Sequence, residues 1–105
     1  MSGYSYVWEF EVRADRQAEF EAAYGPDGAW VALFREAAGY VGTLLLHDRE
    51  RPLRYVTVDR WTSRREYLDF RARFAGRYAA LDRQCEGLTT REQALGEYNE
   101  STPAR

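Results

Sequence analysis

The single histidine of the chain, His47, is the first side chain to consider for chemistry. An imidazole titrates near neutral pH, so it can accept or donate a proton under physiological conditions. His47 ends an apolar run directly before a polar segment. This position fits a proton-transferring group in the wall of a pocket, and it also fits an imidazole half exposed to solvent at the end of a strand.

A second set of candidates alternates along residues 54–61, and its members fall on one side of a β-strand: Tyr55, Thr57, Asp59 and Trp61. If this side faces helices, Thr57 and Asp59 are polar groups in an apolar layer, and each needs a hydrogen-bond partner. Tyr55 and Thr57 are candidate substrate contacts. The alternative is a strand face that is exposed to solvent.

A third set forms one stripe at helical spacing after residue 63: Tyr67, Phe70, Phe74, Tyr78 and Leu81. Together with Trp61, these rings suit the walls of a pocket for a flat aromatic ligand, with Phe70, Phe74 and Tyr78 as substrate contacts. The alternative is an ordinary core with phenol hydroxyls at its edge. Arg83 follows this stripe, either as an anion-binding group or as a solvated surface residue.

Composition excludes several other classes of function. The 105 residues carry a net charge of −2, which argues against nucleic-acid binding. All 15 basic residues are arginines, so no lysine amine is present for covalent catalysis. Cys85 is the only cysteine, which excludes an internal disulfide and a thiolate zinc site, and we expect no metal. The first residues do not resemble a signal peptide and no apolar run is long enough to span a membrane, so we expect a cytoplasmic protein.

The first half of the chain predicts a strand, two helical segments and a second strand. In residues 4–12 an aromatic or aliphatic side chain stands at every second position, from Tyr4 to Val12, which is typical of one face of a strand. Asp15 and Asp27 are placed to cap two helical segments separated by the turn at residues 25–28. Gly39 is placed for a left-handed residue that ends the second segment. Residues 40–47 predict the next strand.

The second half predicts a hairpin strand, one long helix and a last strand. Residues 54–61 form the strand, and Ser63 with Glu66 forms a capping box at the start of the helix. Gly76 is a candidate bend in that helix, and Gly87 ends it. The last strand lies within residues 92–98, and we expect residues 99–105 to be a frayed tail.

The predicted order β-α-β-β-α-β is that of an α+β, ferredoxin-like fold, a four-stranded antiparallel sheet with helices on one face. We expect one domain over residues 1–105, with its core within about residues 4–98. The run Leu44-Leu45-Leu46 gives the second strand apolar groups on both faces. One layer of helices covers only one face, so a second copy of the chain is expected on the other.

The sequence Asp59-Arg60-Trp61, with Ser63 and an aromatic residue six positions after the tryptophan, resembles the antibiotic biosynthesis monooxygenase family. The resemblance covers about residues 4–98 and implies a homodimer whose two sheets meet as an α+β barrel. One branch of the family contains cofactor-free oxygenases that act on aromatic, polyketide-like substrates. His47, Trp61 and Tyr67 stand at the positions of that branch's functional residues, whereas Thr57 replaces its asparagine.

A haem-degrading branch of the same family uses a histidine and a tryptophan of the second helix. Phe70 and Ala80 stand at those positions here, so the resemblance does not extend to haem. The oxygenase branch implies that a pocket base, His47 or Asp59, deprotonates the substrate and that the resulting carbanion passes an electron to oxygen. An isomerase or cyclase, a non-catalytic binding module and a structural dimer are the alternatives, because a fold does not fix a function.

Overall fold

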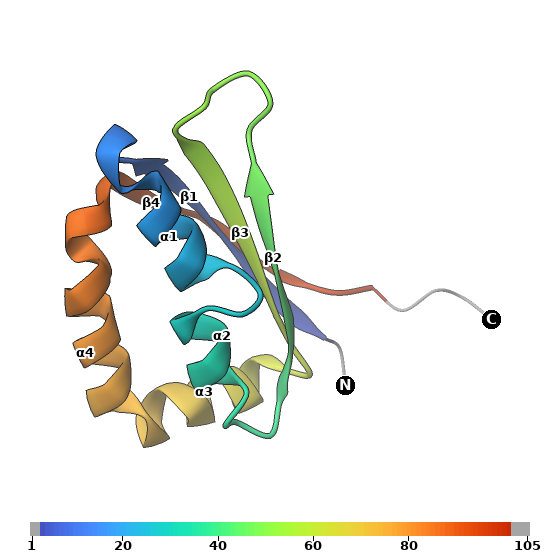
Figure 1. Ribbon diagram of the computed structural model, residues 1–105. Helices are drawn as coiled ribbons and strands as arrows, with labels where there is room; N and C mark the ends of the chain where they lie inside the picture. The colour runs from blue at the N-terminus through green and yellow to red at the C-terminus, as the bar shows by residue number, and fades with distance from the viewer. Residues whose placement is uncertain (1–2, 102–105) are drawn as a thin grey trace.

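The computed structural model describes residues 3–101, which form one antiparallel sheet with helices packed on one of its faces (Figure 1). The sheet has the order β2-β3-β1-β4. Its strands are β1 (Tyr4–Val12), β2 (Tyr40–His47), β3 (Arg54–Trp61) and β4 (Thr89–Asn99). The first three have the bounds that the sequence predicted, and β4 is longer than predicted. This confirms the ferredoxin-like arrangement.

The helices connect the strands in two groups. Between β1 and β2 lie a 3₁₀ turn η1 (Ala14–Arg16), α1 (Gln17–Tyr24) and α2 (Ala29–Phe34). Between β3 and β4 lie α3 (Arg64–Arg73), α4 (Ala75–Cys85) and a 3₁₀ turn η2 (Glu86–Leu88). No described helix is long and apolar enough to cross a membrane.

The core lies between the helices and one face of the sheet. Its largest fully buried side chains are Trp61, Tyr55, Phe20, Phe70 and Val12. The side chains of Tyr55, Thr57, Asp59 and Trp61 therefore lie on the face of β3 that packs against the helices. The two polar residues among them, Thr57 and Asp59, are only 4% and 8% exposed. This confirms the interpretation of β3 as a strand with polar groups between sheet and helices, and it excludes the solvent-exposed alternative.

Three predicted local features differ from the structure. Asp15 lies inside η1, and Asp27 comes one residue before Gly28, which stands at the N-cap of α2, so neither aspartate caps a helix. Gly39 does not have positive φ, because Gly96 alone has it among the described residues. Gly39 is instead required by close packing, since a Cβ there would lie 2.2 Å from Cβ of Glu66.

The long helix predicted after Ser63 is broken into α3 and α4. Ser63 accepts a hydrogen bond from the backbone N–H of Glu66 at 3.2 Å, which confirms that half of the capping box. The break falls at Phe74, with φ −110° and ψ 20°, rather than at Gly76. In Figure 1, α3 crosses one end of the sheet and α4 turns to run alongside it. This change of direction places residues of both helices above β1.

The residues after β4 are attached to the sheet edge where a frayed tail was predicted. Asn99 belongs to β4, and the N–H of Glu100 donates to the carbonyl of Gly3 at 2.7 Å. The carboxylate of Glu100 also accepts hydrogen bonds from Ser5 at 2.6 Å and from Arg60 at 3.0 Å. Residues 102–105 lie outside the described part of the chain.

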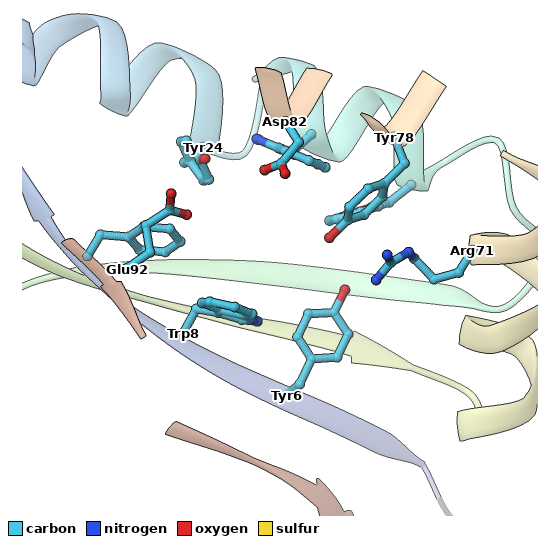
Figure 2. Close-up of a pocket in the computed structure, with 10 residues that line it drawn as sticks. Tyr6, Trp8, Tyr24, Arg71, Tyr78, Asp82 and Glu92 are labelled. Carbon is cyan, nitrogen blue, oxygen red and sulfur yellow. The ribbon is translucent and has the colours of Figure 1, made fainter. Parts of the chain in front are cut away.

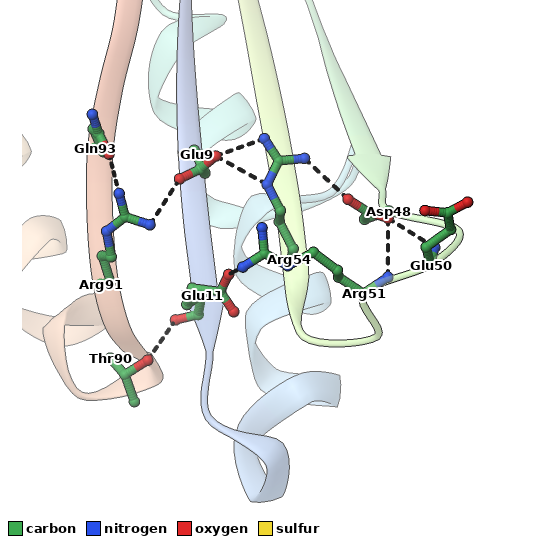
Figure 3. A network of polar contacts seen from close by, with 9 residues as sticks. All are labelled: Glu9, Glu11, Asp48, Glu50, Arg51, Arg54, Thr90, Arg91 and Gln93. Carbon is green, nitrogen blue, oxygen red and sulfur yellow. Dashed lines mark hydrogen bonds and ion pairs between the residues drawn. The ribbon is translucent and has the colours of Figure 1, made fainter.

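The face of the sheet that carries no helix is apolar in one region and charged in another. Leu44 and Leu46 are 55% and 47% exposed there. Toward the other end, Arg54 joins the carboxylates of Glu9 and Asp48, at 2.6 Å and 3.1 Å (Figure 3). Arg91 donates to Glu9 from β4 at 3.1 Å. Leu44 and Leu46 pair with Val58 and Val56 of β3, so these four side chains form an apolar part of the outer face beside the ion-pair network.

Candidate functional site

A cavity of about 380 Å³ lies between the sheet and the helices, at the β1–β4 side of the fold (Figure 2). This volume is within the range of small-molecule sites, about 300–1,000 Å³. It is lined by Tyr6, Trp8, Phe10, Tyr24, Trp30, Phe34, Arg71, Tyr78, Asp82 and Glu92. Most of these side chains are aromatic, so the cavity suits a flat aromatic molecule.

The floor of the cavity comes from β1, whose alternate side chains point toward the helices. Trp8 is 37% exposed although it lies on this face of the strand, and its ring borders the cavity. Its ring is stacked with that of Phe10, with centroids 6.5 Å apart. The opposite wall contains Trp30 and Tyr78, whose rings meet edge to face at 5.0 Å. A planar ligand between these walls would contact ring faces above and below it.

One end of the cavity is basic. The guanidinium of Arg71 lies 3.9 Å from the centroid of the Tyr78 ring and donates a hydrogen bond to the Tyr67 hydroxyl at 2.9 Å. The ring contact and the hydrogen bond hold the guanidinium in place. Burial raises the pKa of Tyr78 to about 12, so its hydroxyl is protonated at neutral pH. In Figure 2, Arg71 and the hydroxyls of Tyr6 and Tyr78 converge at this end.

The other end is acidic. Asp82 of α4 and Glu92 of β4 line it, and Figure 2 shows Glu92 far from Arg71. Partial burial and the neighbouring charge of Asp82 raise the pKa of Glu92 above its usual range. A carboxylate with a raised pKa is a stronger proton acceptor than an exposed one. Glu92 therefore has the position and the chemistry of a general base toward a bound molecule.

Trp30 has an unsatisfied polar group beside the cavity. Its side chain is 7% exposed, and Nε1 has no hydrogen-bond partner among the described residues. A buried donor without a partner costs about 1–3 kcal/mol. This donor has no solvent-accessible surface, so it faces the surrounding side chains and not the open space of the cavity.

Behind the basic end, Tyr6 connects the cavity to the residues that the sequence singled out. Its hydroxyl accepts a hydrogen bond from Nε1 of Trp61 at 3.4 Å. Asp59 is its register partner on β3. Burial raises the pKa of Asp59 to about 6, against the opposing effect of the hydrogen bond that Thr43 donates to it at 2.5 Å.

Four of the predicted site residues come together at this end, in two layers. Tyr78 lines the cavity itself. Trp61, Tyr67 and Asp59 lie one layer deeper, behind Tyr6 and Arg71. The cavity therefore lies beside the predicted Trp61–Tyr67 pocket rather than inside it. Phe70 packs against Trp61 with ring centroids 5.1 Å apart and belongs to the core.

The structure separates His47 from this cluster. His47 pairs with Tyr55 at the start of β3, whereas Trp61 ends that strand six residues later, roughly 20 Å away at about 3.3 Å per residue. The imidazole stacks on the Tyr55 ring at 4.2 Å, and its Nε2 lies 2.7 Å from the carbonyl oxygen of Pro52. His47 therefore does not line the cavity, and the proposal below does not use it as the base.

The remaining candidates also lie outside the cavity lining. The hydroxyl of Tyr55 donates to Glu21 and accepts from Gln17. Thr57 is buried in the sheet–helix layer. Phe74 stands at the junction of α3 and α4, and Arg83 is exposed on α4. Among the described residues, no three histidine, cysteine or acidic side chains cluster as a metal site would require.

The sequence interpretation missed most of the lining. The signal was present in two places. Tyr6, Trp8 and Phe10 alternate on the helix-facing side of β1, and Tyr78 and Asp82 are four residues apart on α4, so they share a face. Neither pattern distinguishes a cavity wall from an ordinary core, and only the packing of α4 over β1 does so.

Comparison with known proteins agrees with this architecture. Residues 4–75 match a family model described as antibiotic biosynthesis monooxygenase. No curated protein matches the chain. Among solved structures, a candidate antibiotic biosynthesis monooxygenase from Bordetella bronchiseptica is 22% identical and superimposes with a TM-score of 0.74, over 97% of this chain and 100% of that one.

A second similar structure is SnoaB, a cofactor-independent oxygenase from Streptomyces nogalater. It is 24% identical, with a TM-score of 0.73 over 98% of this chain and 97% of that chain. A protein from Nitrosomonas europaea gives the same fold at 13% identity, with a TM-score of 0.74 over 99% of this chain and 95% of that one. At these identities the likeness establishes the fold.

Proposed function

Because the chain belongs to the antibiotic biosynthesis monooxygenase family, we propose that it oxidises an aromatic, polyketide-like small molecule with O₂ and without a metal or organic cofactor. The observation that carries this proposal is the aromatic cavity between the sheet and the helices. SnoaB, which has the same fold, is a cofactor-independent oxygenase, and this supports the reaction class.

The proposed chemistry takes its electrons from the substrate. A ring CH₂ flanked by aromatic rings, as in an anthrone, loses a proton to a base, and the carbanion passes one electron to O₂. Recombination of the two radicals forms a C–O bond and, after protonation, a hydroperoxide. Loss of water from the hydroperoxide leaves a ring ketone, so one O₂ gives one ketone and one water. The protein needs to supply only desolvation, orientation and a proton acceptor.

We assign the proton acceptor to Glu92, because its carboxylate lines the cavity and has a raised pKa. Asp59 is the alternative base and lies one layer deeper, beside Tyr6. Trp61 and Tyr67 are positioning residues in this proposal, since Trp61 donates to the Tyr6 hydroxyl and Tyr67 accepts from Arg71.

We also propose that the protein is a homodimer, paired through the outer face of the sheet. The exposed leucines Leu44 and Leu46 support this, because they extend the apolar surface formed by the half-buried Val56 and Val58. A cytoplasmic location is proposed as well, and the buried free thiol of Cys85 is compatible with it.

Oxygen uptake with anthrone tests the proposed reaction. In a closed cell, the protein should accelerate consumption of one O₂ per anthrone converted to anthraquinone, above the rate in buffer alone, and a chelator should not change this rate. Trp8→Glu should abolish the acceleration, since it removes a wall and adds a carboxylate to the floor. Conversion of substrate without oxygen uptake would move the protein to the isomerases or cyclases, and binding without any turnover would leave a binding module.

A further inference from the structure

We propose that the molecule taken by this cavity is an aromatic carboxylic acid, bound with its carboxylate against Arg71. The inference rests on the proposed function, because it names the substrate class of the same site. Two features of the cavity lead to it: an uncompensated positive charge at one end and two carboxylates at the other.

The guanidinium of Arg71 is held only by neutral groups. It contacts the ring of Tyr78 at 3.9 Å and the hydroxyl of Tyr67 at 2.9 Å, and it forms no ion pair with any described residue. By contrast, Arg54 and Arg77 are each paired with a carboxylate. Arg71 thus presents a fixed charge and further N–H donors to the cavity. A planar carboxylate is the group that such a fork binds best.

The acidic end of the cavity determines which way round a carboxylic acid would bind. Asp82 and Glu92 line the cavity opposite Arg71. A carboxylate placed beside them would be repelled, whereas the same group beside Arg71 would be attracted. The charge distribution therefore favours one orientation of an elongated anionic ligand and disfavours the reverse.

Calorimetric titration with two matched probes tests the inference. The probes are 9-fluorenone-2-carboxylate and 9-fluorenone-2-carboxamide, which share three flat rings and a ring ketone and differ in charge. The native protein should bind the carboxylate at least about tenfold more tightly than the amide, because a charge-assisted pair is stronger than a neutral hydrogen bond. This preference should decrease as salt is added.

Substitutions on α3 then test whether Arg71 causes the preference for the carboxylate probe. Arg71→Gln should reduce the ratio of the two dissociation constants to about one, and Arg71→Lys should retain part of it. Arg73→Gln is the matched control, because it removes the same charge from the same helix at a position that does not line the cavity, and it should keep the full ratio. Circular dichroism establishes that each variant is folded.

The outcomes separate this inference from the proposed function. Equal affinity of the native protein for both probes, or a preference that survives Arg71→Gln, would overturn the carboxylate inference while leaving an aromatic cavity. Failure of the native protein to bind either probe would overturn the assignment of the cavity itself, and with it the proposed reaction.

Discussion

Glu92 is one of the two carboxylates that line the cavity, and the proposed deprotonation depends on it. Glu92→Gln keeps the shape of the side chain and removes the base, so kcat should fall by about 10²–10⁴-fold. Because the pKa of Glu92 is raised, the rate of the native protein should decrease as the pH is lowered through that raised value. Steady-state rates between pH 4 and 9 measure both effects.

Glu86→Gln provides the control for this substitution, since Glu86 is exposed in η2 and does not line the cavity. It should leave the rate and its pH dependence unchanged. A Glu92→Gln variant with the native rate would remove Glu92 as the base and would return that role to Asp59.

The raised pKa of Asp59 should make the free energy of unfolding depend on pH. Its pKa is raised from 3.8 to about 6 in the folded protein, so the folded state holds this proton more tightly than the unfolded chain. The stability contributed by the protonated carboxyl is therefore complete below pH 4 and is lost as the pH rises through 6, at a cost of about 3 kcal/mol. Asp59→Asn should gain stability relative to the native protein over this pH interval.

Urea unfolding of both proteins at several pH values measures this difference. Other carboxylates, such as Glu100 with a pKa of about 2, affect both proteins alike and cancel in the comparison. Asp27→Asn, in the exposed turn before α2, is the matched control. A difference between native and Asp59→Asn that does not vary from pH 4 to 7 would contradict the raised pKa.

For individual residues, the sequence predicted which types of side chain form the site more accurately than where the site lies. It identified aromatic walls and polar groups under the helices, and Tyr78 does line the cavity. Arg71 and Asp82 were not identified, because charged residues on a helix usually face solvent. Their position above β1 depends on the break at Phe74, which no local pattern marks.

Among the elements, the strands were predictable because alternation of side chains has the same period as the pleat. β1 and β3 begin and end where that pattern does, and β2 also has its predicted bounds although Leu44-Leu45-Leu46 does not alternate. Helix ends were less predictable, since Asp15 and Asp27 have capping side chains but the chain enters α1 and α2 through a 3₁₀ turn and Gly28. Such entries depend on tertiary packing, which overrides local capping preference.

Replacement of two glycines by alanine should change the stability of the fold in opposite directions. A Cβ on Gly39 would lie 2.2 Å from that of Glu66, so Gly39→Ala should force β2 and α3 apart and lower the free energy of unfolding by about 1–3 kcal/mol. A Cβ on Gly76 would meet nothing within 4 Å, so Gly76→Ala should raise that free energy by about 0.5 kcal/mol. Urea unfolding measures both changes.

The pair also tests the explanation of the helix break. Because the break lies at Phe74, the bend does not need the flexibility of Gly76. A loss of stability in Gly76→Ala would contradict this account, and so would an unchanged stability in Gly39→Ala.

The whole molecule has one face that the helices leave uncovered, and the proposed dimer depends on it. Leu44 is 55% exposed on this face, so Leu44→Asp is compatible with a folded monomer but puts a buried, unpaired charge into the proposed interface. Sedimentation at micromolar concentration should give twice the chain mass for the native protein and the mass of a single chain for this variant.

Leu68→Asp is the matched control, because Leu68 is 44% exposed on α3 and lies away from the outer face of the sheet. This variant should sediment as the native protein does. A native protein that sediments as a monomer at all concentrations would contradict the dimer, and so would a Leu44→Asp variant that remains dimeric.

The central claim is that a flat aromatic molecule binds between the β1 strand and α4. A crystal structure of the protein with anthraquinone, the expected product from anthrone, tests this claim most directly. We expect ring density in the cavity between Trp8 and Tyr78. Density for the ligand only on the outer face of the sheet, with the cavity unchanged, would contradict it.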